Sequence, residues 1–108
     1  MDELTELQAW YLAQCDGDWE HEFGVRIETL DNPGWSVGVQ IEGTALESVP
    51  FTEVQDLAPE RGWIACRVEG GEWRGHGGPL MLAAILRHFL TWARDPGPAP
   101  VSGRPPAA

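Results

Sequence analysis

The stretch from residue 19 to residue 42 alternates between apolar and polar side chains, with one interruption at Asn32-Pro33-Gly34. Before the interruption the odd positions are mostly apolar and the even positions mostly acidic, and the odd positions are apolar again after it. Side chains of a β-strand point alternately to its two faces. The pattern therefore predicts a β-hairpin, with strands over roughly 19–31 and 35–43, that has one apolar face and one largely acidic face.

The length of the hairpin loop follows from this alternation. A two-residue loop at Pro33 and Gly34 would set odd positions opposite even ones, which would place Ile27 beside Gln40 and mix the two faces. An odd loop, or a bulge, keeps the faces matched, so we expect a loop of about three residues in which Gly34 takes a positive φ. The residues predicted to be buried together on the apolar face are Val25, Ile27, Val37, Val39 and Ile41.

Two helices flank the predicted sheet. Apolar residues recur at helical spacing over 3–15, where Asp2 is placed to cap the N-terminus. A second amphipathic helix is predicted over 79–94, because proline suits the first position of a helix. Further strands are expected over the ranges 48–57 (an edge or bulged strand, because of Pro50), 63–69 and 72–75.

These elements predict an α+β fold with a single domain. An antiparallel sheet of four to five strands has its apolar face covered by both helices, which leaves the acidic face open. The domain is expected to span residues 1–95. Residues 96–108 consist almost entirely of Pro, Gly, Ala and Ser, and are expected to form a disordered tail.

Charge is distributed unevenly along the chain. The net charge is −10, and the sequence has no lysine. Residues 1–60 hold 14 acidic side chains against one arginine, whereas residues 61–108 hold three against six arginines. Such a field repels nucleic acid and anionic membranes and attracts a basic partner. It also has a simpler interpretation, which is that acidity keeps the protein soluble.

The candidate partner-binding residues are the carboxylates of the predicted acidic face and of its ends. Within this face Arg26 is the only opposing charge, so most of the carboxylates are predicted to lack an internal partner. The set comprises Asp16, Asp18, Glu20, Glu22, Glu28, Asp31 and Glu42.

Metal and thiol chemistry receive little support from the residue spacing. A zinc site built from Cys15, His21, Cys66 and His76 would lack the paired spacing of known zinc motifs. Cys66 is predicted to be buried in a strand, and the acidic residues that follow Cys15 would disfavour its thiolate. No cofactor is therefore predicted.

Several segments resemble immunity protein family 53 of the bacterial polymorphic toxin systems. The likeness covers roughly residues 4–93. The segments that carry it are Trp10-Tyr11, Cys15-Asp16-Gly17, Asp18-Trp19-Glu20-His21, Thr29-Leu30-Asp31-Asn32-Pro33-Gly34-Trp35, Trp63-Ile64-x-Cys66 and the terminal helix that ends near Trp92. The resemblance implies a small intracellular protein that binds and neutralises a co-encoded toxin domain. It implies no defined binding residues.

Three hypotheses follow for the function. The first is a non-enzymatic, cytoplasmic immunity protein that occludes a basic toxin, such as a nuclease, through its acidic surface. The second is a small metal-dependent hydrolase that uses the acidic turn 16–20 together with His21. The third is an adaptor that binds another basic protein. No signal-like or membrane-spanning run is evident in the sequence, and neither nucleic acid nor a membrane is an expected partner.

Overall fold

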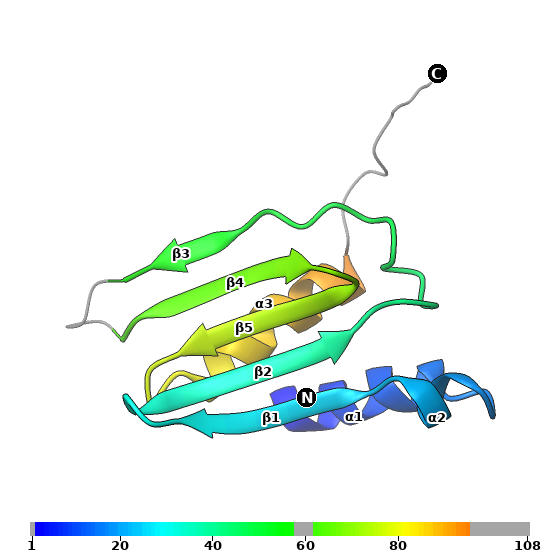
Figure 1. The fold of residues 1–108 in the computed structure, drawn as a ribbon, viewed down its shortest axis with the longest axis horizontal. Coiled ribbons are helices and arrows are strands. Elements are labelled where there is room, and N and C mark those ends of the chain that lie inside the picture. Colours follow the sequence, from blue (N-terminus) through cyan, green and yellow to red (C-terminus); the bar gives the residue numbers. More distant parts are fainter. Residues whose placement is uncertain (1, 58–61, 96–108) are drawn as a thin grey trace, which may run out of the picture.

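A five-stranded antiparallel sheet forms one layer of the protein, and two helices form the other (Figure 1). The computed structural model describes residues 2–57 and 62–95. The strand order is β1-β2-β5-β4-β3. The elements in chain order are α1 (Glu3–Gln14), α2 (Trp19–Glu22), β1 (Val25–Leu30), β2 (Gly34–Gln40), β3 (Val54–Asp56), β4 (Ile64–Glu69), β5 (Glu72–Gly77) and α3 (Leu82–Arg94).

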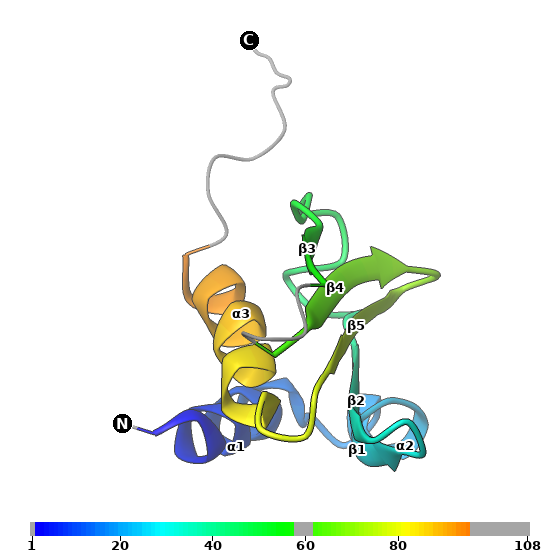
Figure 2. The ribbon, with the colours of Figure 1, turned by 90° about the vertical axis from the view of Figure 1, so that its left-hand side faces the viewer.

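Both long helices, α1 and α3, cover the same face of the sheet, and the opposite face is open (Figure 2). This confirms the predicted α+β class and the predicted placement of the helices. Asp2 caps α1 as expected, since its Oδ1 accepts a hydrogen bond of 2.8 Å from the backbone N–H of Thr5. Among the described residues, no helix is long and apolar enough to span a bilayer. The predicted tail, 96–108, lies outside the described residues.

The register of the first hairpin confirms the prediction that odd-numbered residues of one strand lie opposite odd-numbered residues of the other. Ile27 pairs with Val37, and the pair Leu30–Gly34 closes a loop of three residues, 31–33, that contains a cis peptide between Asn32 and Pro33. The predicted positive φ at Gly34 is wrong, because Gly34 is the first residue of β2. A Cβ at Gly34 would collide with the carbonyl oxygen of Gly77 on β5, so glycine is needed there for close strand packing.

The start of the hairpin differs from the prediction. Residues 19–22 form the short helix α2, and β1 begins only at Val25. His21 is therefore exposed and does not lie on the apolar face. Four alternating residues fit one helical turn as readily as a strand, and hydrogen bonds in the preceding turn decide in favour of the helix.

The core lies between α3 and the central strands. Trp73 of β5 is fully buried, and its ring packs edge-on against Phe89 of α3 at a centroid distance of 5.3 Å. Gly75 makes this approach possible, because a Cβ there would lie 2.5 Å from Cγ2 of Ile85. The β5 strand, at Glu72–Gly77, is two residues longer than the predicted 72–75. Its glycines Gly75 and Gly77 both face α3.

Two further boundaries differ from the prediction. The helix α3 begins at Leu82 rather than at residue 79, because the segment from Gly78 forms a turn in which the N–H of Met81 donates to the carbonyl of Gly78. The strand predicted over 48–57 is reduced to β3, which does lie at the edge of the sheet.

Burial on the apolar face is graded from the centre of the sheet to its edge. Val37, Val39 and Ile41 are buried, Val25 is partly buried, and Ile27 keeps 38% of its surface exposed. The prediction that all five are buried together is therefore wrong for Ile27. Its strand is an outer one, and helix packing is centred on β5.

We expect isoleucine-to-alanine substitutions at the two ends of this gradient to differ in cost. Ile41 is 1% exposed, so Ile41→Ala should lower the free energy of unfolding by about 2–5 kcal/mol. Ile27→Ala should lower it by roughly 1 kcal/mol, because less apolar surface is lost. Urea unfolding of micromolar protein measures both values. Equal costs would contradict the burial gradient.

Candidate partner-binding surface

The turn between α1 and α2 is held by carboxylates that bond to the backbone. Oδ1 of Asp16 accepts hydrogen bonds from the N–H groups of Asp18 and Trp19, both of 2.9 Å. The carboxylate of Glu20 accepts from the N–H groups of Asp16 and Gly17, also at 2.9 Å. Only the N–H of Trp19 belongs to α2, whose first residue it is, and the other three N–H groups precede the helix, so these bonds fix the turn that leads into α2.

The same hydrogen bonds lower the pKa of both carboxyl groups. The N–H of Trp19 is the largest cause at Asp16, followed by that of Asp18. At Glu20 its own backbone N–H lowers the pKa most, desolvation opposes it, and the N–H groups of Asp16 and Gly17 add to the lowering. Both groups are therefore ionised at neutral pH.

Trp19 fastens this turn to the rest of the protein. Its side chain is buried, and its Nε1 donates a 2.9 Å hydrogen bond to the carbonyl of Glu42, which follows β2. Its ring lies edge-on to Trp10 and Tyr11 of α1 at centroid distances of 6.1 and 6.0 Å. Gly43, at φ 79°, leaves the space that the Trp19 ring occupies. The loop after β2 and the turn before α2 are thereby held together.

This contact gathers carboxylates from two segments into one surface, which we call the acidic end. The acidic end consists of Asp16, Asp18, Glu20, Glu22, Glu42 and Glu47. Three of these residues, Asp18, Glu22 and Glu42, are exposed and form no ion pair with any described residue. Glu47 could not be predicted from the alternating pattern, because it lies in a loop outside that pattern. Its carboxylate accepts a hydrogen bond from the N–H of Gly43 at 3.3 Å.

Two of the predicted site residues lie elsewhere. Glu28 is on β1, where it pairs with Arg26 at 3.2 Å, and Asp31 lies in the loop at the other end of the hairpin. The prediction that Glu20 and Glu22 share a strand face with Glu28 is therefore wrong. The structure brings five of the seven predicted residues together.

The open face of the sheet is not acidic, contrary to the prediction. Strands β4 and β5 add two arginines to Arg26, and glutamates of the same strands pair with them. Glu72, whose side chain is only 12% exposed, bonds Arg74 at 2.9 Å and Arg26 at 3.4 Å. The six charged side chains that alternate over this face are Arg26, Glu28, Arg67, Glu69, Glu72 and Arg74. Their formal charges cancel.

The open face also carries His76, while the two thiols lie elsewhere. Burial, followed by the charges of Arg67 and Arg74, lowers the pKa of His76, so this imidazole is neutral at physiological pH.

Cys66 is buried, and desolvation raises the pKa of its thiol to about 12. Both cysteines are free thiols, and the Sγ of Cys15 donates to the carbonyl of Tyr11 at 3.3 Å.

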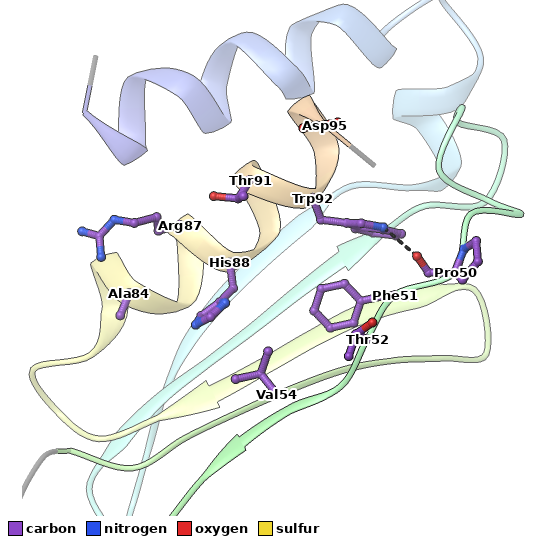
Figure 3. A pocket seen from close by; sticks show the side chains of 10 residues that line it. All are labelled: Pro50, Phe51, Thr52, Val54, Ala84, Arg87, His88, Thr91, Trp92 and Asp95. Atoms are coloured by element: carbon purple, nitrogen blue, oxygen red, sulfur yellow. Dashed lines mark hydrogen bonds between the residues drawn. The ribbon is translucent and has the colours of Figure 1, made fainter. Parts of the chain in front are cut away.

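A groove of about 460 Å³ runs between α3 and the segment before β3 (Figure 3). Its floor contains Phe51 and Trp92, whose rings lie 5.1 Å apart. Trp92 also holds the segment before β3 against α3, because its Nε1 donates a 3.0 Å hydrogen bond to the carbonyl of Pro50. The rim carries His88 of α3 and Asp95, which follows it.

The residues considered for metal binding are not gathered into a site. Within residues 2–57 and 62–95, no group of three or more His, Cys, Asp or Glu side chains is arranged to hold a metal ion.

Comparison with known proteins gives one family match. A family model described as Immunity protein 53 matches residues 4–94, from the first turn of α1 to the last residue of α3. No curated protein and no solved structure matches this chain.

Alanine substitutions in the acidic turn should change the melting temperature differently at a carboxylate that bonds to the backbone and at one that has no partner. Asp16→Ala removes the acceptor for two N–H groups, so the melting temperature should fall by roughly a few degrees. Asp18→Ala removes an exposed carboxylate without a partner, and the melting temperature should stay within about 1 °C.

The cost of Asp16→Ala should also depend on pH. The folded-state pKa of Asp16 is lowered, so its stabilising contribution is complete above the ordinary aspartate pKa of about 4. It is lost as the pH falls through the folded value. The melting temperatures of the variant and the parent should therefore begin to converge below about pH 4 and become equal below the folded-state pKa. A constant difference down to about pH 2 would contradict the assigned hydrogen bonds.

The two thiols should react differently with an aromatic disulfide reagent. At about pH 8 the native protein should consume about one equivalent rapidly, at Cys15, because burial suppresses the Cys66 thiolate. Unfolding in urea should release the second equivalent. Rapid reaction of both thiols in the native protein would show that Cys66 is accessible.

Proposed function

Because this chain belongs to the immunity protein 53 family, it is an immunity protein, and we propose that it neutralises its toxin by binding it through the acidic end. The observation that carries the proposal is the set of exposed carboxylates at Asp18, Glu22 and Glu42, which form no ion pair with the rest of the described chain. Gathered like charges of this kind repel one another, and a cationic partner relieves that repulsion.

The rigidity of the acidic end supports the same proposal. Its two segments are fastened by the buried Trp19 side chain and by the backbone bonds to Asp16 and Glu20. Carboxylates on a fixed scaffold lose little conformational entropy on binding. The open face of the sheet is a weaker candidate, because its arginines and glutamates already neutralise each other.

The fitting partner is a basic toxin domain of a polymorphic toxin system, such as a nuclease. An enzyme that acts on nucleic acid presents cationic side chains to phosphate groups. Carboxylates spaced along α2 and the loop after β2 would occupy those cations and exclude the substrate. In this account the immunity protein acts in the cytoplasm, by occlusion, without a cofactor or a catalytic step of its own.

Charge reversal at the free carboxylates tests this proposal. We expect the triple variant Asp18→Lys, Glu22→Lys, Glu42→Lys to associate with the toxin domain encoded beside it at least about tenfold more slowly, because electrostatic steering is lost. Its association rate should also depend less on salt concentration. Stopped-flow fluorescence at several salt concentrations measures both effects.

A matched control changes the net charge equally at exposed carboxylates that are not part of the acidic end. The triple variant Asp31→Lys, Glu53→Lys, Asp95→Lys has this property. It should keep at least about a third of the parent's association rate at physiological salt, and it should still protect cells that express the toxin. If both triple variants slowed association equally, the loss would come from the change in net charge and not from the acidic end, and the proposed site would be overturned.

A further inference from the structure

The outer edge of β1 is a long strand edge that no described strand covers. The strand has six residues, and it pairs only with β2. The other edge of the sheet, β3, has three residues. Exposed edges are commonly shortened or covered, because their free backbone groups pair with other chains. In Figures 1 and 2, β1 forms the border of the sheet, and neither α1 nor α3 lies over its outer side.

The hydrogen-bond pattern identifies which backbone groups point outward. The N–H of Gln40 donates to the carbonyl of Gly24, so even-numbered residues of β1 exchange hydrogen bonds with β2. The N–H and C=O groups of Val25, Ile27 and Thr29 therefore point away from the sheet. These three residues can form hydrogen-bonded pairs with another strand.

We propose that this edge pairs with the β1 edge of a second copy of the chain, antiparallel and about a two-fold axis at Ile27. In this register Ile27 pairs with Ile27 of the second copy, and Val25 pairs with Thr29. All three use their outward backbone groups. Arg26 then lies opposite Glu28 of the second copy, and Glu28 lies opposite its Arg26. The two five-stranded sheets become one continuous sheet.

Charge selects this register over its neighbours. Outward backbone groups restrict the pairing to steps of two residues. One step in one direction would set Arg26 against Arg26, and one step in the other would set Glu28 against Glu28. Like charges directly opposite each other are destabilising, whereas opposite charges stabilise a pair. The two side chains pair with each other within the chain at 3.2 Å, but both are more than half exposed, at 59% and 58%, so each can also contact a second copy.

Apolar surface lies beside the same edge. Ile27 is partly exposed, and a hollow of about 320 Å³ next to Val25 is lined by residues of α1, among them Leu7 and Tyr11. The proposed register places Thr29 of the second copy beside Val25, at the mouth of this hollow. A two-fold interface buries the same patch on both chains. Because the strands run antiparallel, the two acidic ends lie at opposite ends of the paired strands.

Sedimentation velocity over a range of protein concentrations, at physiological salt and without toxin, tests the proposal. The parent chain should form dimers. Arg26→Glu would set glutamates against each other across the axis, and Glu28→Arg would set arginines against each other. Each variant alone should therefore dimerise at least about tenfold more weakly. An equimolar mixture of the two should dimerise as well as the parent to within about threefold, because the opposite charges meet again. The double variant should do the same.

Ile27→Pro provides a variant that does not depend on charge. Its missing N–H points outward, so the hairpin with β2 keeps its hydrogen bonds while the dimer loses its central pair. Far-UV circular dichroism should be unchanged, and the chain should be monomeric. The proposal is overturned if the parent remains monomeric at about millimolar concentration, which would leave the edge to a strand of another protein. It is also overturned if the single variants dimerise like the parent, or if their mixture stays monomeric.

Discussion

The contact between α3 and β5 is the constraint on which the other packing depends. Gly75 has no side chain, so Ile85 of α3 lies directly on the strand beside the ring of Trp73. From there a line of aromatic contacts crosses the molecule. Trp73 meets Phe89 at 5.3 Å, Phe89 meets Trp10 of α1 at 5.0 Å, and Trp10 meets Trp19 at 6.1 Å. The carboxylates of the acidic end are thus positioned by the core, although they lie at the periphery.

Local sequence patterns predicted the elements whose cause is local. The parity of the first hairpin could be read from the alternation on either side of Pro33, and Asp2 was recognisable as a cap because its partner lies three residues away. The helical turn at Trp19 was missed, because four residues are too few to separate the two periods. What decided it was a pair of carboxylates, at Asp16 and Glu20, that bond to the backbone.

Features that depend on strand order were beyond the reach of such patterns. The sequence places most arginines in its second half, and only the insertion of β5 between β2 and β4 brings Arg74 beside the hairpin. The face that looked acidic along the chain is therefore neutral in three dimensions. Five of the seven predicted binding residues still meet in one surface, because Trp19 draws the loop after β2 toward α2. The free carboxylates of the two segments are therefore gathered at the acidic end and not along the open face.

The most direct test of this account is a map of the toxin contact by amide chemical shifts. In ¹⁵N-labelled protein the largest changes on adding the toxin domain should fall in residues 16–22 and 42–47, together with the indole N–H of Trp19. Arg67, Arg74 and His76 on the open face should change little. Changes centred on the open face, with residues 16–22 unaffected, would contradict the assignment of the acidic end as the binding surface.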